Sequence, residues 1–254
     1  MKEFLDKIGS MAEVKVNGYR DSYIENKVKA FVYSYFAKEE MSKQSDAEQI
    51  RVYAVGDIDV ILKEVGNFTI KAILLGLEVD LKIKKTCKAV MKIKEEGNQW
   101  TITDIKMTTQ SGEAVLTEDI IEDWDKNISK LRAISAIYHS FCLFEAPKKN
   151  VDAIVNCYAR EFEVMYPWGG CKTYEQLVKW VSGISEKSSY AHHVKKLIIS
   201  NIQNGEVECS ADVTYQTVND NGEFRSMELH YDFVLQDNEN GLPQIAKSIT
   251  TINK

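Results

Sequence analysis

Proline is scarce in this sequence of 254 residues, which contains 3 prolines and 13 glycines. That composition excludes collagen-like and low-complexity chains, and a 44% share of apolar residues excludes an intrinsically disordered one. Long hydrophobic runs are also missing, since the longest lies near Ala72–Leu77 and a membrane helix needs roughly 20 residues. The first ten residues are charged and hold no apolar core for a signal peptide. We therefore expect a soluble, cytoplasmic, globular protein with no membrane partner.

A basic surface is absent as well. Lysine and arginine number 32 against 38 acidic residues, a net charge of −6, so nucleic acid is not an expected partner. The cysteines are odd in number, widely spaced and without a C-x-x-C pair, which disfavours both a disulfide framework and a zinc site. We expect them to be reduced and mostly buried, and we expect no metal and no cofactor. They are Cys87, Cys142, Cys157, Cys171 and Cys209.

Two parts of the chain share one pattern. Residues 31–62 match residues 136–166 in the placing of aromatic and apolar side chains, and residues 88–109 match residues 232–253. The sequence therefore predicts an α+β protein with an internal duplication, in which each copy is a helix-plus-curved-antiparallel-sheet domain. The expected divisions are a lead segment at 1–19, a first domain at 20–110, a linker at 111–117 and a second domain at 118–254.

Each predicted domain opens with an amphipathic helix. In the first, Asp21 or Ser22 is the expected cap, and in the second the expected cap is Thr117. Acidic residues between 118 and 125 suit the start of the second helix. The apolar stripe of the first helix is Ile24, Val28, Phe31 and Tyr35, and that of the second is Ile121, Trp124, Ile128, Leu131, Ile134, Tyr138 and Phe141.

Alternating residues then predict strands. Residues 206–218 alternate strictly and follow Asn204-Gly205, a dipeptide typical of a hairpin turn. In the first domain an apolar set alternates with lysines, which favours a sheet with one solvated face. That set is Val79, Leu81, Ile83, Ala89, Met91 and Ile93. Thr173 and Gln176 form a capping box, which predicts a short third helix in the second domain.

The second domain resembles a known family. Tyr138 and Phe141, the segment YAREFEVMYPWGG and the segment SYAHHVKKLIIS are similar to the SnoaL-like branch of the nuclear transport factor 2-like fold. That branch includes polyketide cyclases, scytalone dehydratase and bile-acid dehydratase relatives, and the resemblance covers roughly residues 118–254. It implies a cone-shaped domain with a pocket open at one end. The first domain looks like an abbreviated version that lacks the third helix.

The resemblance also implies site residues. It places a catalytic base at His193, or at its neighbour His192, with Tyr166 as the hydroxyl that polarises a carbonyl. The acidic partner of the family falls near Leu143 and Phe144, where the nearest carboxylate is Glu145. The cone is expected to hold a small apolar ligand, with Trp168-Gly169-Gly170 as a flexible loop at its mouth. The expected ligand-binding residues are Tyr138, Phe141, Trp168, His192 and Tyr215.

These residues form a coherent chemical set, because proton abstraction beside a carbonyl needs a base active near neutrality and a hydroxyl donor for the developing oxyanion. The first hypothesis is therefore a metal-free lyase or isomerase of the dehydratase type. A second is a protein that only binds the ligand. A third is an assembly module, which includes a homodimer formed through the outer sheet faces. His230, between Glu228 and Asp232, is expected to face outward from its strand.

Overall fold

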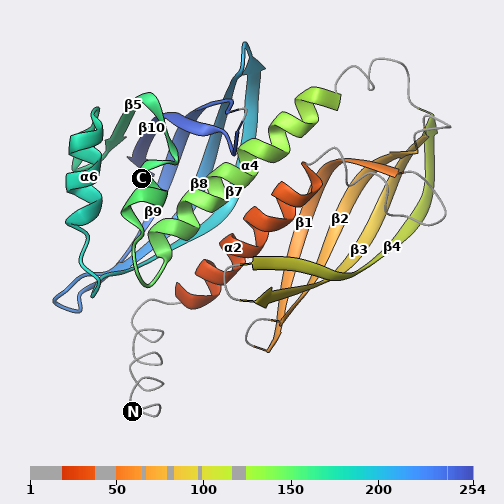
Figure 1. Ribbon diagram of the computed structural model, residues 1–254, viewed down its shortest axis with the longest axis horizontal. Coiled ribbons are helices and arrows are strands. Elements are labelled where there is room, and N and C mark those ends of the chain that lie inside the picture. Colours follow the sequence, from red (N-terminus) through yellow and green to blue (C-terminus); the bar gives the residue numbers. More distant parts are fainter. Residues whose placement is uncertain are drawn as a thin grey trace. The chain divides into compact units, whose positions relative to one another are not determined.

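The computed structural model describes residues 19–37, 50–64, 67–78, 83–96, 99–115, 124–238 and 240–253 (Figure 1). None of the helices in these ranges has both the length and the apolar character that a membrane span requires. The helices are α2 (Tyr19–Phe36), α4 (Trp124–Glu145), α5 (Val151–Val155) and α6 (Tyr174–Ser182). The strands are β1 (Ile50–Glu64), β2 (Asn67–Glu78), β3 (Ile83–Glu96), β4 (Gln99–Val115), β5 (Tyr158–Tyr166), β6 (Gly169–Cys171), β7 (Ser189–Gln203), β8 (Glu206–Val218), β9 (Phe224–Gln236) and β10 (Gln244–Ile252).

The chain divides into two compact units, and the mixture of helices and sheets agrees with the predicted α+β class. Residues 28–135 form the four-stranded unit, and residues up to Lys27 together with those from Ala136 onward form the six-stranded unit. Both boundaries fall inside helices, one in α2 and one in α4. The first turns of α2 therefore belong to the same unit as the C-terminal sheet, which the sequence did not suggest.

The four-stranded unit is an antiparallel meander in the order β1-β2-β3-β4. The predicted alternation on β3 is confirmed, since Ala89, Met91 and Ile93 are buried between exposed lysines. Trp100 of β4 stacks on Phe68 with ring centroids 5.3 Å apart and also contacts Phe31 of α2. Of the predicted alternating set, Val79 and Leu81 lie outside the described residues.

The segment predicted as a linker is largely strand. Residues 111–115 continue β4, whose end at Val115 pairs with Ile83 of β3. The register between these strands shifts between Lys84 and Thr86, opposite the part of β4 that contains Gly112. Glycine and polar residues mark a β-bulge as readily as a connection, which explains the difference. Residues 116–123 lie outside the described ranges, and with them Thr117 and most of the acidic run.

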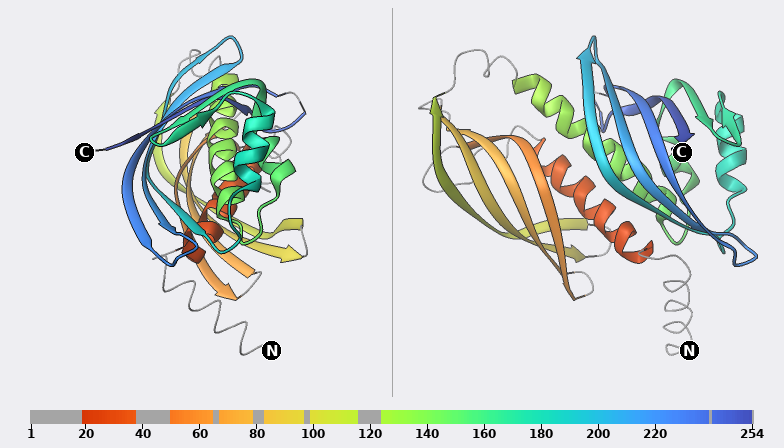
Figure 2. Two further views of the ribbon diagram at one scale, coloured as in Figure 1. Left: turned by 90° about the vertical axis from the view of Figure 1, so that its left-hand side faces the viewer. Right: turned by 180° about the vertical axis from the view of Figure 1, so that it is seen from behind.

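The six-stranded sheet has the order β6-β5-β10-β9-β8-β7 and curves around the C-terminal half of α4 (Figure 2). On β8 the predicted alternation is confirmed, because every second residue from Val207 to Val213 is buried. Asn204 and Gly205 have φ of 53° and 77°, the positive values that a tight hairpin turn requires. One pair departs from the expected antiparallel sheet, since β5 and β10 run parallel. No hairpin joins these two strands, so neither direction is imposed on them.

From α4 onward the element order is long helix, short helix, strand, a third helix and then long strands. This is the order expected from the resemblance to the nuclear transport factor 2-like fold. The predicted duplication is not confirmed, because the two sheets differ in strand number and order. Thr173 caps α6 as predicted, accepting a hydrogen bond from the backbone N–H of Gln176.

Helix α2 buries only part of the predicted stripe: Val28 is fully buried as predicted, but two polar residues are buried as well. It begins at Tyr19, so Ser22 lies inside the helix instead of capping it. Ser22 and Asn26 are both buried, whereas Ile24 and Tyr35 are only half-buried. A buried polar side chain is stable only with hydrogen-bond partners. Ser22 and Asn26 have such partners among the residues of the candidate site, and these partners explain why both side chains are buried.

Candidate functional site

A cavity of about 200 Å³ lies in the six-stranded unit, between the inner face of its sheet and the helices α4 and α6. Aromatic side chains form most of its wall, and polar tips among them come from tyrosines and one histidine. An apolar cavity with a few polar groups is the usual form of a small-molecule site. The lining residues are Ser140, Phe141, Phe144, Tyr158, Val164, Tyr166, Trp168, Trp180, Ile184, Tyr190, His192, Tyr215, Leu229, Tyr231, Phe233, Ile245, Ser248 and Thr250.

His192 is the histidine of this wall. Its imidazole lies flat against the ring of Phe141, with centroids 4.5 Å apart and an interplanar angle of 9°. Tyr215, directly opposite His192 on β8, tilts against it at 5.0 Å. The residue is only 7% exposed. Two aromatic neighbours thus hold the imidazole in one orientation at the cavity wall.

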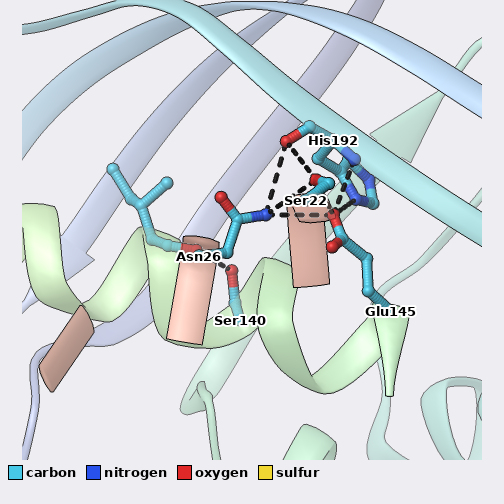
Figure 3. Close-up of polar contacts among 6 residues, drawn as sticks. Ser22, Asn26, Ser140, Glu145 and His192 are labelled. Carbon is cyan, nitrogen blue, oxygen red and sulfur yellow. Dashed lines mark hydrogen bonds and ion pairs between the residues drawn. The ribbon is translucent and has the colours of Figure 1, made fainter. Parts of the chain in front are cut away.

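Glu145, the last residue of α4, is fully buried beside this histidine (Figure 3). Its Oε1 atom is 3.0 Å from Nδ1 of His192 and accepts a hydrogen bond of 2.6 Å from the backbone N–H of the same residue. A backbone N–H can only donate, so Oε1 acts as an acceptor here. In the neutral imidazole Nδ1 therefore carries the hydrogen toward Oε1, and the other ring nitrogen, Nε2, has the lone pair.

Five tyrosine hydroxyls are among the other polar groups of the cavity, together with the side chains of Ser140, Ser248 and Thr250. Burial raises the pKa of Tyr158, Tyr215 and Tyr231 well above the ordinary value of 10.0. Burial also raises the pKa of Tyr166 and Tyr190, which stand nearer the mouth. All five hydroxyls therefore keep their protons near neutral pH. They can donate hydrogen bonds to an oxygen that gains negative charge.

The thiols of the unit are unsuited to nucleophilic chemistry. Burial, together with the charge of Glu145, raises the pKa of Cys142 to about 12, and burial raises the pKa of Cys209 to about 12. A thiol is reactive as its thiolate, so these groups are inert near neutrality. In the part of the chain that the structure describes, no three His, Cys, Asp or Glu residues are grouped to hold a metal.

An open cleft of about 770 Å³ adjoins the cavity. The two share four wall residues, Tyr166, Trp180, Ile184 and Tyr190, so these side chains border both. Polar and charged groups line the outer part of the cleft, namely Gln176, Lys179, Ser185, Ser188, Asn219, Asp220 and Asn221. The wall of the cleft is therefore more polar than that of the cavity.

The glycines at the mouth have a different role from the predicted one. Gly169 and Gly170 form β6, paired with Tyr166 and Met165 of β5. A Cβ atom on Gly170 would lie 2.6 Å from the backbone oxygen of Val164, which real Cβ atoms essentially never approach so closely. Close approach of two strands, rather than freedom of the backbone, thus requires this glycine.

Most of the predicted site residues lie where a ligand could reach them. Of these, Phe141, Tyr166, Trp168, His192 and Tyr215 line the cavity.

The other predicted residues lie elsewhere. Glu145 binds His192 from behind the cavity wall. Tyr138 is buried in α4 and does not line the cavity. His193 follows His192 along β7, so its side chain is on the opposite face of the sheet, away from the cavity. Of the two histidines, His192 lines the cavity and His193 does not.

Several residues of the cavity wall, and two that contact Glu145, were not predicted from the sequence. Tyr190, Tyr231 and Trp180 line the cavity, and the alternation of β9 around His230 was a usable signal for Tyr231. Ser22 and Asn26 of α2 were also missed, although both bind Glu145. Their spacing of four residues places two small polar side chains on one face of a helix, which is a signal for a buried polar contact.

No family model matches this chain, and no curated protein matches it. Solved structures are similar over about half of the chain. A protein provisionally named a scytalone dehydratase, from Novosphingobium aromaticivorans, is 13% identical over 51% of this chain and 88% of its own, with a TM-score of 0.43. A ketosteroid isomerase-like protein from Erwinia carotovora atroseptica is 14% identical over 48% and 94%, with a TM-score of 0.41. A protein provisionally named a dehydratase of the nuclear transport factor 2-like family, from Streptomyces avermitilis, is 8% identical over 47% and 91%, with a TM-score of 0.41.

Proposed function

We propose that the six-stranded unit binds a small cyclic molecule bearing a carbonyl or hydroxyl group and transfers a proton on it, as a lyase or an isomerase does. In this proposal Nε2 of His192 is the base and Glu145 holds the imidazole in the required tautomer. The tyrosine hydroxyls of the cavity donate to the oxygen on which charge develops.

One observation carries the proposal: a histidine at the wall of an apolar cavity has its Nδ1 atom 3.0 Å from a fully buried carboxylate. Burial of a carboxylate costs free energy unless the group is well paired. The position of Glu145 behind His192 therefore favours a functional role for the pair. A histidine takes up or releases a proton near neutral pH, as general acid–base catalysis requires.

The wall of the cavity favours a compact, ring-shaped ligand. Phe141, Tyr231 and Phe233 form a cluster in which the last two rings are parallel, with centroids 5.5 Å apart. Flat rings bind flat molecules through offset stacking and edge contacts. At about 200 Å³ the cavity is below the usual range of roughly 300–1,000 Å³ for drug-sized ligands, which favours a small substrate.

Hydrogen–deuterium exchange tests the proton transfer without knowledge of the natural substrate. The protein is incubated in D₂O with a panel of small cyclic ketones, and loss of the proton beside the carbonyl is followed by ¹H NMR. We expect exchange above the buffer rate for at least one ketone. His192→Gln should slow that exchange by about 10²–10⁴-fold, the usual contribution of a positioned base.

The neighbouring histidine is the matched control. His193→Gln removes the same side chain from the same strand but from the other face, so its exchange rate should equal that of the unaltered protein. Loss of exchange in His193→Gln with retention in His192→Gln would overturn the assignment of the base. Binding of the ketones without exchange would favour the alternative, a protein that holds a ligand without converting it.

A further inference from the structure

We propose that Ser22 and Asn26 of α2 are positioning residues of this site, which fix Glu145 and thereby the tautomer of His192. The inference rests on the proposed function and deepens it. It assigns control of the base to a helix that the sequence placed in the other domain. Both residues belong to the six-stranded unit.

The contacts are direct. The side-chain amide of Asn26 donates to Oε1 of Glu145 at 3.0 Å and lies 3.3 Å from the backbone oxygen of His192 (Figure 3). Ser22 Oγ is 3.3 Å from the same Oε1 and 3.1 Å from the same backbone oxygen. Both side chains are almost fully buried, at 2% and 3% exposure. One carboxylate oxygen and one carbonyl thus receive donors from two successive turns of α2.

The number of hydrogens on its side-chain amide explains why asparagine suits position 26. The NH₂ group of Asn26 has two hydrogens, which match the two acceptors, Oε1 of Glu145 and the carbonyl of His192. Asn26 therefore links the end of α4 to β7, the two elements that carry the pair. Ser22 has one hydroxyl hydrogen and can serve either acceptor at a time.

The effect on the histidine follows from geometry. Oε1 must stay 3.0 Å from Nδ1 if Nδ1 is to keep its hydrogen and Nε2 its lone pair. With the donors of α2 removed, Oε1 keeps the backbone N–H of His192 but loses two of its other donors, so the carboxylate is held less firmly and the imidazole can also adopt the tautomer that carries its hydrogen on Nε2. That tautomer cannot act as a base toward the cavity. The donors of α2 therefore act on the rate of proton transfer rather than on ligand binding.

A merely structural role makes a different prediction. If Ser22 and Asn26 only fill space beneath β7, a replacement of similar volume leaves the histidine tautomer unchanged. The discriminating variants are Asn26→Leu, which keeps the approximate volume and removes both donor hydrogens, and Ser22→Ala, which removes one oxygen atom. Ser22→Thr keeps the hydroxyl and tests rescue. Ser34→Ala is the matched control, because Ser34 lies on the same helix and hydrogen-bonds Ser135 instead of the site.

The experiment measures two quantities on the full chain. Nitrogen-15 NMR of the histidine rings reports which ring nitrogen of His192 carries the hydrogen, with His192→Gln identifying its signals. Exchange of the best ketone gives kcat and KM. For Asn26→Leu we expect a mixture of tautomers and a fall in kcat of roughly 10- to 100-fold at unchanged KM. Ser22→Ala should show the same change to a smaller degree, and Ser22→Thr and Ser34→Ala should resemble the unaltered protein.

The outcomes separate this inference from the proposed function. An unchanged tautomer and kcat in both Asn26→Leu and Ser22→Ala, with exchange still lost in His192→Gln, would overturn the inference and leave the function standing. If no ketone exchanges at all, the proposed function fails, and the nitrogen spectra still decide whether α2 sets the tautomer. If Asn26→Leu does not fold, Ser22→Ala decides through the same spectra.

Discussion

The two sheets of the molecule present inner faces of different chemistry. On β2 and β3 the inward residues are Phe68, Ile70, Met91 and Ile93, all at most 5% exposed, and the ring of Trp100 covers Phe68. On β7, β8 and β9 the corresponding face carries the polar-tipped rings of the cavity wall, His192, Tyr215 and Tyr231. The first face is therefore apolar throughout these residues, whereas the second also presents hydroxyls and an imidazole.

This difference separates two roles that a β-sheet can have, which are to stabilise the fold and to present polar groups to a cavity. A closely packed apolar face gives most of its burial to stability. A face of polar-tipped rings gives up part of that packing and keeps hydroxyls and an imidazole within reach of a ligand. We therefore expect substitutions in the four-stranded unit to affect stability, and those in the cavity to affect chemistry.

The largest effect on stability should come from Met91→Ala on β3. Met91 is fully buried, so its loss removes apolar burial and leaves a cavity, at a cost of about 2–5 kcal/mol. Urea denaturation measures the free energy of unfolding. Lys92→Ala is the matched control, since the side chain of Lys92 is 61% exposed and its loss should change the value by less than about 0.5 kcal/mol. Equal effects of the two variants would remove the basis of the comparison.

Tyr231→Phe should separate stability from chemistry. The ring and its stacking on Phe233 remain, while the hydroxyl that donates to a developing oxyanion is removed. The free energy of unfolding should stay within about 1 kcal/mol of that of the unaltered protein. The ketone exchange rate should fall at least tenfold. Destabilisation beyond about 2 kcal/mol with an unchanged exchange rate would make this hydroxyl a structural group.

Trp168→Ala should act on ligand affinity with little effect on stability. Trp168 is 60% exposed and lines the cavity at its rim, beside Tyr166. Its loss should change the free energy of unfolding by less than about 0.5 kcal/mol and weaken ketone binding severalfold, as measured by NMR titration. Phe224→Ala is the control, because this side chain is similarly exposed but lies outside the cavity wall. If both variants bind the ketone equally, Trp168 has no part in the site.

The smallest effect should come from His230, which faces outward as predicted, with Nδ1 2.7 Å from Asp212. Their hydrogen bond raises the pKa of His230 above its ordinary 6.5 and lowers the pKa of Asp212 below its ordinary 3.8. The raised pKa gives stability that is full below about 6.5 and lost as the pH rises through the folded value. The lowered pKa gives stability that is present above about 3.8 and lost on further acidification.

His230→Gln should therefore reduce Tm slightly near pH 5 and leave it unchanged near pH 8.5. Thermal unfolding followed by circular dichroism at the two pH values measures this difference. The ion pair is exposed to solvent and screened by salt, so the shift should shrink as the salt concentration rises. A shift of equal size at both pH values would show that the charge of His230 has no part in it.

Local patterns predicted much of the fold. The strict alternation of β8, the turn at Asn204 and Gly205 and the cap of α6 at Thr173 depend on residues close together in sequence, and the structure has all three. The position of the cavity in the C-terminal part followed from the family resemblance. The alternation, the turn and the cap can be recognised from a hydrophobic period or a turn preference alone.

The residues of the site were harder to predict from the sequence, because the site depends on contacts between residues far apart in the chain. The choice between His192 and His193 requires the register of β7 against β8, since a shift of one residue exchanges the faces of a strand. The contact of Asn26 with Glu145 joins residues 119 positions apart, and no periodicity within α2 encodes its partner. The apolar stripe predicted for α2 was only partly right, since Val28 is fully buried but the helix also buries a polar pair that is stable only beside Glu145.

The parallel pairing of β5 with β10 sets an order of assembly for the cavity. β5 forms early in the chain of the six-stranded unit, but β10, which fills the place between β5 and β9, comes after every other strand of that sheet. During synthesis the ribosome therefore releases β5 with one edge uncovered until the last strand emerges, and such non-local pairing is slow. Because Ile245, Ser248 and Thr250 of β10 line the cavity, a nascent chain completes the cavity wall only when this strand has been added.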